Sequence, residues 1–287
     1  MFYSTVNGDR LAWSSRRYVF RFSPCVRVWS PTCMVGTQWC PPLSSAYPPN
    51  PHRLMFVLTL KKLAFTPHFI DMKKNENRGD WYLGIDKRGI VPVLVHDGKV
   101  VVETNDILLY VAEQFPDTTP RLVPPVGDRA NNALLRELLV FQESYHSDMR
   151  YLSMTKLPMA KRCPGCWRSS LRDTGGAAPT EDNAADSVAN LKRILGRVDT
   201  EYATKPFLVG GAFGLADMAF WMDVRRLLSV DFPVETCLPH MWKMYWRLSP
   251  ILGHADVGDG SSIPDLSGAR DALLRGAGGA AVGRGLV

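Results

Sequence analysis

The sequence predicts an α/β first domain followed by an all-α helical-bundle domain. Up to about residue 116, helical and strand-like hydrophobic patterns alternate, and beyond the proline-rich stretch "PDTTPRLVPPVGD" (116–128) the periodicity is almost wholly helical. A chain of 287 residues is long enough for two ordinary domains. Composition places it among globular proteins, with 46% hydrophobic and 22% charged residues.

The first half shows a mixed order of elements. In sequence order, the pattern predicts a helix over "NPHRLMFVLTLKKLAF" (50–65), a strand over 65–72, a polar connection with one helical turn over 75–89, a hairpin over 91–103 and a helix over 104–116. Pro51 falls in the first turn of its helix, where proline is tolerated. Asp97-Gly98 favours the positive φ angles of a two-residue hairpin turn. Thr104 is a plausible N-cap.

The second half predicts four helices. They cover 128–152, 180–203, 214–230 and 238–250, and the third is hydrophobic nearly all round, which is typical of a central helix. We therefore expect an atypical or disordered extension over 1–45, the α/β domain over 46–120, the helical domain over 128–255 and a flexible Gly/Ala-rich tail over 256–287.

The net charge of +6 does not indicate nucleic-acid binding by the folded body. Residues 1–53 hold six arginines and one acid, whereas the rest of the chain holds 28 basic and 27 acidic residues. A nucleic-acid-binding domain would concentrate its basic residues in the folded part. The longest apolar stretch is broken by Lys61 and Lys62, so no membrane span is expected either.

The N-terminal segment is Arg-rich and acid-poor, which is the composition of an organelle transit peptide. A poorly packed extension or a misassembled reading frame is the alternative. The six cysteines lack the spacing of a disulfide scaffold. Cys163 and Cys166 form a lone CxxC in a Pro/Gly/Arg-rich stretch. No second ligand pair follows, so we expect an exposed loop and no metal site.

Three motifs, in this order and spacing, resemble the cytosolic glutathione transferase family. They are the first helix "NPHRLMFVLTLKKLAF", the stretch "RGIVPVLVHDG…VVETNDILLYV" and the second-domain motif "FLVGGAFGLADMAFW" (207–221). The first helix is closest to bacterial-type members with Ser-Pro-Asn-Pro. The resemblance spans about 50–255. It implies a thioredoxin-like first domain, glutathione as co-substrate, a small hydrophobic electrophile, and a cytoplasmic, homodimeric detoxification transferase.

The resemblance also implies the glutathione site. Ile90, Val91 and Pro92 stand where the family has a cis-proline edge whose valine N–H and C=O pair with the cysteinyl backbone of glutathione, as in strand addition. Glu103 and Thr104 stand where the family binds the γ-glutamyl end. A carboxylate can pair with the ligand's ammonium there, with Asp106 adding charge, and a hydroxyl at a helix N-terminus can hold its carboxylate. Either Arg88 or Lys87 is a candidate for the glycyl carboxylate.

The thiol-activating residue is harder to place. The family supplies Ser, Tyr or Cys just before the first helix, and the aligned residue here is Pro48. Ser45 and Tyr47 are the catalytic candidates, with Ser44 beside them. Asn50 could donate an amide N–H instead.

The first strand is also missing from its usual place in the sequence. The nearest strand-like run is "RYVFRF" (17–22), followed by Cys25 in a Phe-x-Pro-Cys-like turn. Either a large insertion separates it from the first helix, or the sheet has lost an element.

By family analogy, the electrophile pocket is lined from the long helix, with four candidates that could equally be core: Phe141, Tyr145, Met149 and Tyr151. Asp217 is expected at N3 of its helix, reaching back to a Gly214 N-cap, as a folding motif. Two alternatives to the transferase remain. One is a non-catalytic protein-interaction module, which Pro48 and the missing strand favour. The other is a glutathione-dependent thiol-disulfide reductase that uses Cys25.

Overall fold

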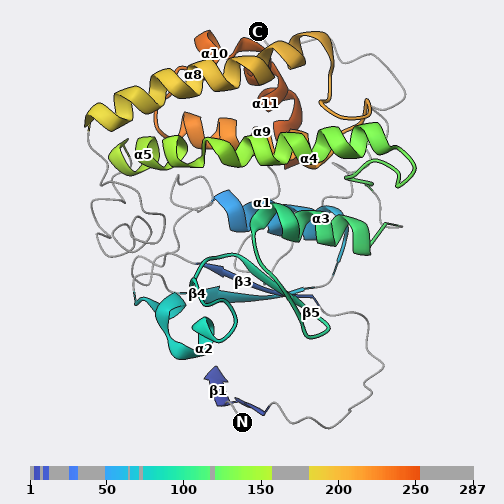
Figure 1. The fold of residues 1–287 in the computed structure, drawn as a ribbon, viewed down its shortest axis with the longest axis vertical. Helices are drawn as coiled ribbons and strands as arrows, with labels where there is room; N and C mark the ends of the chain where they lie inside the picture. The colour runs from blue at the N-terminus through green and yellow to red at the C-terminus, as the bar shows by residue number, and fades with distance from the viewer. Residues whose placement is uncertain are drawn as a thin grey trace.

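The computed structural model describes residues 3–6, 9–12, 26–31, 49–63, 65–70, 74–116, 120–156 and 181–252. Figure 1 shows them in layers: a sheet, a pair of helices above it, and a set of longer helices above that pair. The α/β part followed by an all-helical part agrees with the predicted fold class. Residues 157–180 and 253–287 lie outside the described ranges, and so do Cys163 and Cys166.

The sheet has four strands in the order β4-β3-β5-β6. Strands β3 (Val26–Pro31) and β4 (Phe65–Ile70) are parallel, while β5 (Val93–His96) is antiparallel to both β3 and β6 (Lys99–Val101). Parallel strands need a crossover connection, and the chain between β3 and β4 contains helix α1 (Pro49–Leu60). This is the thioredoxin-like arrangement that the resemblance implies.

Strand β3 decides between the two alternatives left open for the first strand, because the sheet has not lost this element. The strand exists, but it lies at 26–31, within the range assigned to an extension and after the "RYVFRF" run at 17–22, which is outside the described residues. Val26 and Arg27 pair with Phe65 and Thr66 on one side and with His96 and Val95 on the other. Apolar and polar residues alternate only weakly in "VRVWSP". Pairing with β4 and β5, rather than the local sequence pattern, therefore defines this segment as a strand. A separate hairpin, β1 (Tyr3–Val6) with β2 (Asp9–Ala12), forms its own two-stranded sheet.

The two faces of the sheet carry cores of very different size. Leu94 of β5 belongs to the large core with α1 and α3 (Thr104–Gln114), whose Leu54, Leu58, Ile107 and Leu108 are fully buried. Val93 points to the opposite face and packs with Ile70 and Tyr82, the latter on the short helix α2 (Asp80–Leu83). This alternation follows from the two-residue period of a strand.

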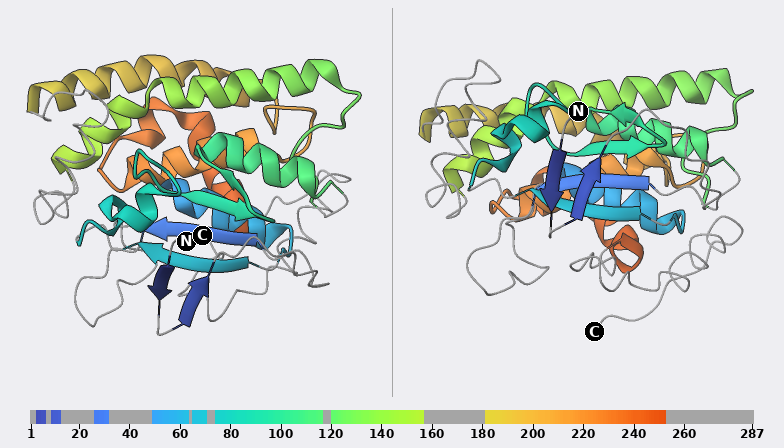
Figure 2. Two further views of the ribbon diagram at one scale, coloured as in Figure 1. Left: turned by 60° about the horizontal axis from the view of Figure 1, so that its bottom comes forward. Right: turned by 90° about the horizontal axis from the view of Figure 1, so that it is seen from below.

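The helical part differs from prediction at its first helix and in the additional short helix α10 (Val234–Cys237). The segment expected as a single helix over 128–152 is two helices, α4 (Arg129–Ser144) and α5 (His146–Lys156), separated at Tyr145. Asp128 caps α4, since its side chain accepts a hydrogen bond from the Asn131 N–H at 3.1 Å. Helix α8 (Glu181–Thr204) packs along α5 (Figure 2).

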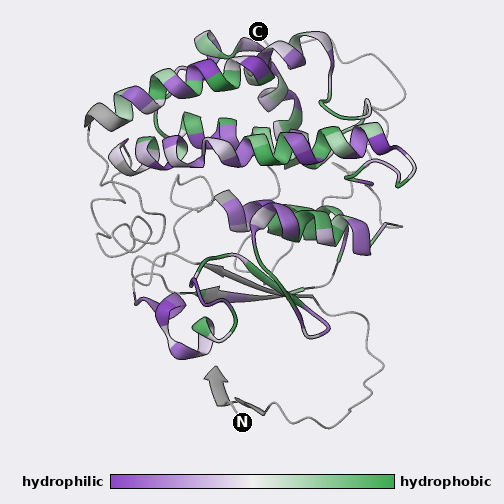
Figure 3. Cartoon of the chain, in the orientation of Figure 1, coloured by the Kyte–Doolittle hydropathy of each residue, from purple (hydrophilic) through white to green (hydrophobic). Residues whose placement is uncertain are grey.

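Helix α9 (Leu215–Leu228) is the central helix, as predicted. Every residue from Leu215 to Val224 is buried, and it contacts α1, α4, α5 and α11 (Pro239–Leu252). Helices α4 and α8, on the outside, show both hydrophilic and hydrophobic colours in Figure 3, as amphipathic helices do. The short helix α10 (Val234–Cys237) precedes α11. None of the helices in the described ranges is long and apolar enough to cross a membrane.

Asp217 lies at N3 of α9, as predicted. Its carboxylate accepts hydrogen bonds from the Gly214 N–H, the Leu208 N–H and the Tyr202 hydroxyl, each at 3.0 Å. A Cβ at position 214 would lie 3.0 Å from the Leu122 carbonyl oxygen, which explains glycine where the family has Ser or Thr. The carboxylate therefore links the start of α9 to α8 and to the preceding loop.

We predict that the Asp217 carboxyl makes unfolding pH-dependent. Burial, the largest effect, raises the pKa of Asp217 from 3.8 to about 6, so the folded state binds this proton more tightly than the unfolded state. The associated stabilisation is complete below about pH 4 and is lost as pH rises through about 6; it amounts to roughly 3 kcal/mol. Urea unfolding from pH 4 to 7, compared with Asp217→Asn, measures it. Parallel profiles for the two proteins would contradict the prediction.

Candidate functional site

The candidate site lies where the chain enters β5. The loop before it is held by three buried or partly buried contacts: the Asn77 amide donates to the Gly89 carbonyl at 2.9 Å, the Ile90 N–H donates to Asp86 at 3.3 Å, and the Tyr82 hydroxyl donates to the Ile90 carbonyl at 2.7 Å. Gly89 has φ +63°, and a Cβ there would lie 2.5 Å from the Asn77 carbonyl oxygen. Only glycine fits this approach.

The Val91–Pro92 peptide bond is cis, as the resemblance implies. Strand β5 begins at Val93, after this bond. No described residue hydrogen-bonds to the Val91 N–H or C=O. Ile90, by contrast, has both of its backbone groups occupied by Asp86 and Tyr82, so Val91 is the residue in this stretch with backbone groups available for a ligand.

The N-terminus of α3 adjoins this edge. Helix α3 begins at Thr104, with Glu103 as the N-cap residue, so Thr104 is one position inside the helix rather than its cap. Glu103 has φ +65° and ψ +124°, a conformation that costs a non-glycine residue on the order of 1–3 kcal/mol and that occurs often at functional sites. Thr104 is 7% exposed, and its hydroxyl makes no hydrogen bond to any described residue.

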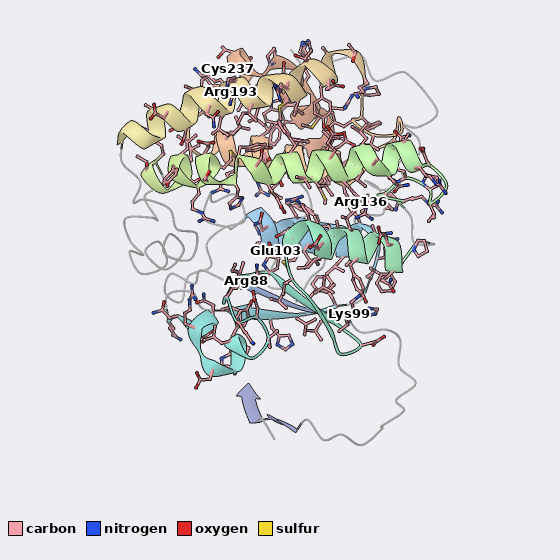
Figure 4. All side chains as sticks on the ribbon, in the orientation of Figure 1. Arg88, Lys99, Glu103, Arg136, Arg193 and Cys237 are labelled. Carbon is pink, nitrogen blue, oxygen red and sulfur yellow. The ribbon has the colours of Figure 1, made fainter. Side chains whose placement is uncertain are left out.

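Glu103 carries an ion pair that sequence reasoning did not predict. Its carboxylate pairs with the Arg88 guanidinium, which also contacts the Asp86 carboxylate at 3.3 Å. In Figure 4 Arg88 and Glu103 lie together between the sheet and α3. The carboxylates of Asp86 and Glu103 therefore hold the Arg88 guanidinium beside the backbone edge that contains Val91.

Further acidic groups lie near this helix terminus. Glu143 of α4 accepts a hydrogen bond from the Asn105 amide at 2.8 Å. Burial, followed by the carboxylates of Glu103 and Asp106, raises the pKa of Glu143. The carboxylates of Glu103 and Asp106 are therefore close enough to act on Glu143, and the three groups concentrate negative charge near the N-terminus of α3.

A buried polar network joins the site to the helical part. The Arg53 guanidinium of α1 donates to Asn105 at 2.6 Å and to Gln142 at 3.2 Å. Gln142 donates to both oxygens of Asp223 on α9, at 3.2 and 3.1 Å, and the Tyr145 hydroxyl donates to Asp223 at 2.7 Å. Burial lowers the pKa of Arg53 and the charge of Asp223 opposes that shift.

Sequence reasoning missed this network, although a signal for it existed. Arg53 interrupts the apolar face of a helix, and Asp223 interrupts a helix that is otherwise hydrophobic nearly all round. Two opposite charges in such positions indicate a buried pair, because a charge is seldom buried alone.

The remaining predicted site residues divide into three groups. One group lies outside the residues that the structure describes: Ser44, Ser45, Tyr47, Pro48 and Cys25. Asn50 lies in the first turn of α1 and is partly exposed. Of the pocket candidates, Tyr145 and Met149 are core residues, at 0% and 2% exposure, while Phe141 and Tyr151 are partly exposed. No cluster of His, Cys, Asp and Glu suited to a metal ion occurs in the described part of the chain.

Comparison with known proteins identifies the class. Residues 48–114 match the family model described as "Glutathione S-transferase, N-terminal domain". This match, together with a thioredoxin-like part followed by a helical part, supports a protein of the cytosolic glutathione S-transferase type.

Particular relatives are more distant. Protein LigF of Sphingobium sp. is 40% identical over 81 residues, which cover 28% of this chain and 32% of LigF. The transcriptional regulator URE2 of Saccharomyces cerevisiae is 22% identical over 223 residues, 70% of this chain and 63% of that protein. The glutathione transferase URE2P8 of Phanerochaete chrysosporium, solved with oxidized glutathione, superposes with a TM-score of 0.62 at 15% identity, covering 89% of this chain and 99% of that one. The chain thus spans less than two thirds of the length of LigF and of URE2.

We predict that Arg53→Met lowers the free energy of unfolding by about 3–5 kcal/mol, because it leaves buried polar partners and the Asp223 carboxylate without their cation. Arg136→Met is the matched control, since Arg136 forms an exposed ion pair with Glu113 and such pairs contribute about 0–1 kcal/mol. Urea denaturation at pH 7 measures both. Equal losses in the two variants would show that the network does not stabilise the fold.

Proposed function

We propose that this protein binds glutathione along the Val91 edge and transfers its thiolate to a small hydrophobic electrophile. The observation that carries the proposal is the Val91 backbone, whose N–H and C=O have no partner among the described residues beside the cis Pro92. A cysteinyl residue in extended conformation can occupy both groups, as an added strand does.

The far end of glutathione fits the α3 terminus. Its α-carboxylate would accept hydrogen bonds from the Thr104 hydroxyl and from the first-turn N–H groups of α3, which have no intrahelical partners. Its ammonium would lie near the carboxylates of Glu103, Asp106 and Glu143. Arg88, which pairs with Glu103 and Asp86, is the cation that we propose for the glycyl carboxylate.

For catalysis, the thiol must lose its proton at neutral pH, although its ordinary pKa is near 8.5. One hydrogen bond to the thiolate contributes about 1.5–3 kcal/mol, which lowers that pKa by roughly one to two. Our candidate among the described residues is the Asn50 amide, in the first turn of α1. Ser45 and Tyr47 remain predicted hydroxyl donors.

The second candidate function is a glutathione-transferase-like module that binds proteins and performs no conjugation. The relative named as a transcriptional regulator favours it, since that name describes no transferase activity. In either case, homodimerisation, a cytoplasmic location and the domain limits given above are expectations that the resemblance supplies.

We expect Thr104→Val to weaken glutathione binding by about 10-fold to 100-fold, because valine keeps the shape of threonine but removes a hydrogen bond to a charged group. Isothermal titration with glutathione measures the affinity. Thr200→Val, on an exposed face of α8, is the matched control. An unchanged affinity in Thr104→Val would contradict the site.

We expect Asn50→Ala to lower kcat for 1-chloro-2,4-dinitrobenzene by about 10-fold or more, with glutathione affinity preserved, because only the thiolate loses a hydrogen bond. Stopped assays at pH 7 and 8 measure it. If the unsubstituted protein binds glutathione but conjugates nothing, the interaction module is correct. If it does not bind glutathione at all, both the site and the transferase proposal are wrong.

A further inference from the structure

One ion pair joins two side chains that the proposed glutathione site assigns to opposite ends of the ligand. The Arg88 guanidinium, from the loop before β5, pairs with the carboxylate of Glu103, the N-cap residue of α3. Figure 4 labels both side chains, and they lie together between the sheet and α3. In the proposed site, Glu103 is near the γ-glutamyl ammonium and Arg88 receives the glycyl carboxylate. In the structure these two groups bind each other instead.

The Arg88–Glu103 pair is accessible to a ligand. The side chains of Arg88 and Glu103 are each 47% exposed, whereas the neighbouring Asp86 side chain is 7% exposed. An ion pair that is exposed to this extent contributes little to stability, so a ligand can separate it at small cost.

Asp86 keeps the Arg88 guanidinium in this region when Glu103 binds another group. One oxygen of its carboxylate accepts hydrogen bonds from the Arg88 N–H at 3.2 Å and from the Arg88 Nε at 3.3 Å. The other oxygen accepts the Ile90 N–H at 3.3 Å, which ties Asp86 to the residue before Val91. Separation of Arg88 from Glu103 therefore leaves the cation beside the Val91 edge.

The charges of the ligand oppose those of the pair. An ammonium that reaches the Glu103 carboxylate also approaches the Arg88 guanidinium, and like charges a few ångströms apart repel each other. A carboxylate that reaches Arg88 meets the carboxylates of Glu103 and Asp86 in the same way. A ligand with both charged ends gives Glu103 and Arg88 new partners, whereas a ligand with one charged end replaces only one of them.

We propose that the Arg88–Glu103 pair competes with both ends of glutathione and is a specificity determinant of this site. It favours peptides with an ammonium at the γ-glutamyl end and a carboxylate at the glycyl end over ligands that lack either charge. The inference rests on the proposed glutathione site, and it adds that Arg88 and Glu103 each weaken the contact that the other makes with the ligand.

The test uses three S-hexyl ligands of nearly equal size, so that it depends neither on the thiol nor on turnover. The first is S-hexylglutathione. The second is its glycinamide analogue, which lacks the glycyl carboxylate. The third is its glutaryl analogue, which keeps the carboxylate of the γ-glutamyl group but lacks the amine. Isothermal titration measures the affinity of each ligand for the unsubstituted protein and for the variants Arg88→Met and Glu103→Gln.

Each variant should bind one analogue more tightly than the unsubstituted protein does. Arg88→Met should bind the glycinamide analogue about two- to fivefold more tightly, because the cation that competes for Glu103 is gone. Glu103→Gln should bind the glutaryl analogue about two- to fivefold more tightly, because Arg88 is then available to the glycyl carboxylate. Loss of a simple ligand contact would not strengthen binding, so the direction of the change distinguishes competition from contact.

Arg136→Met is the matched control. It removes another exposed ion pair, in which Arg136 of α4 contacts Glu113 of α3 at 2.7 Å, and it should leave all three affinities unchanged. If S-hexylglutathione binds the unsubstituted protein but either analogue binds its variant no more tightly, the competition is wrong and the glutathione site stands. If S-hexylglutathione does not bind the unsubstituted protein, the proposed function is wrong and this inference is wrong with it.

Discussion

The buried Arg53 guanidinium is the contact on which the relation between the two halves of this protein depends. It lies on the first helix, it is 2% exposed, and it reaches Asn105 beside the proposed ligand site and Gln142 in the helical domain. A buried cation without partners costs several kcal/mol, so the surrounding amides and Asp223 must stay in place once Arg53 is buried. One side chain thereby fixes α1, α3, α4 and α9 relative to one another.

The proposed glutathione site is built from backbone more than from side chains. A glycine at positive φ, a buried asparagine and a buried tyrosine hold the loop before β5, and they leave the Val91 amide and carbonyl without described partners. Glu103 adds a second unusual conformation at the start of α3. Such positions persist only where the surrounding structure enforces them. The side chains then supply charge, with carboxylates near the start of α3 and the Arg53 guanidinium towards α9.

The acidic side chains suit one end of the proposed ligand. The carboxylates near Thr104 suit the ammonium of a γ-glutamyl group, which is a feature of the proposed first substrate.

The sequence by itself determined the order of elements from α1 onward, the Asp97-Gly98 hairpin, the cis bond before Pro92, the central place of α9 and the Gly214–Asp217 cap. The cis bond is what the family resemblance implies, and the other features follow from local pattern or from a few residues at fixed spacing. Tertiary structure alone decided the rest. Strand β3 has only weak alternation, and its pairing with β4 and β5 defines it. The break between α4 and α5 occurs at Tyr145, whose side chain turns inward to Asp223, and Glu103 pairs with Arg88, fifteen residues away. Contacts between residues far apart in the chain set these features, and no local signal in the sequence encodes them.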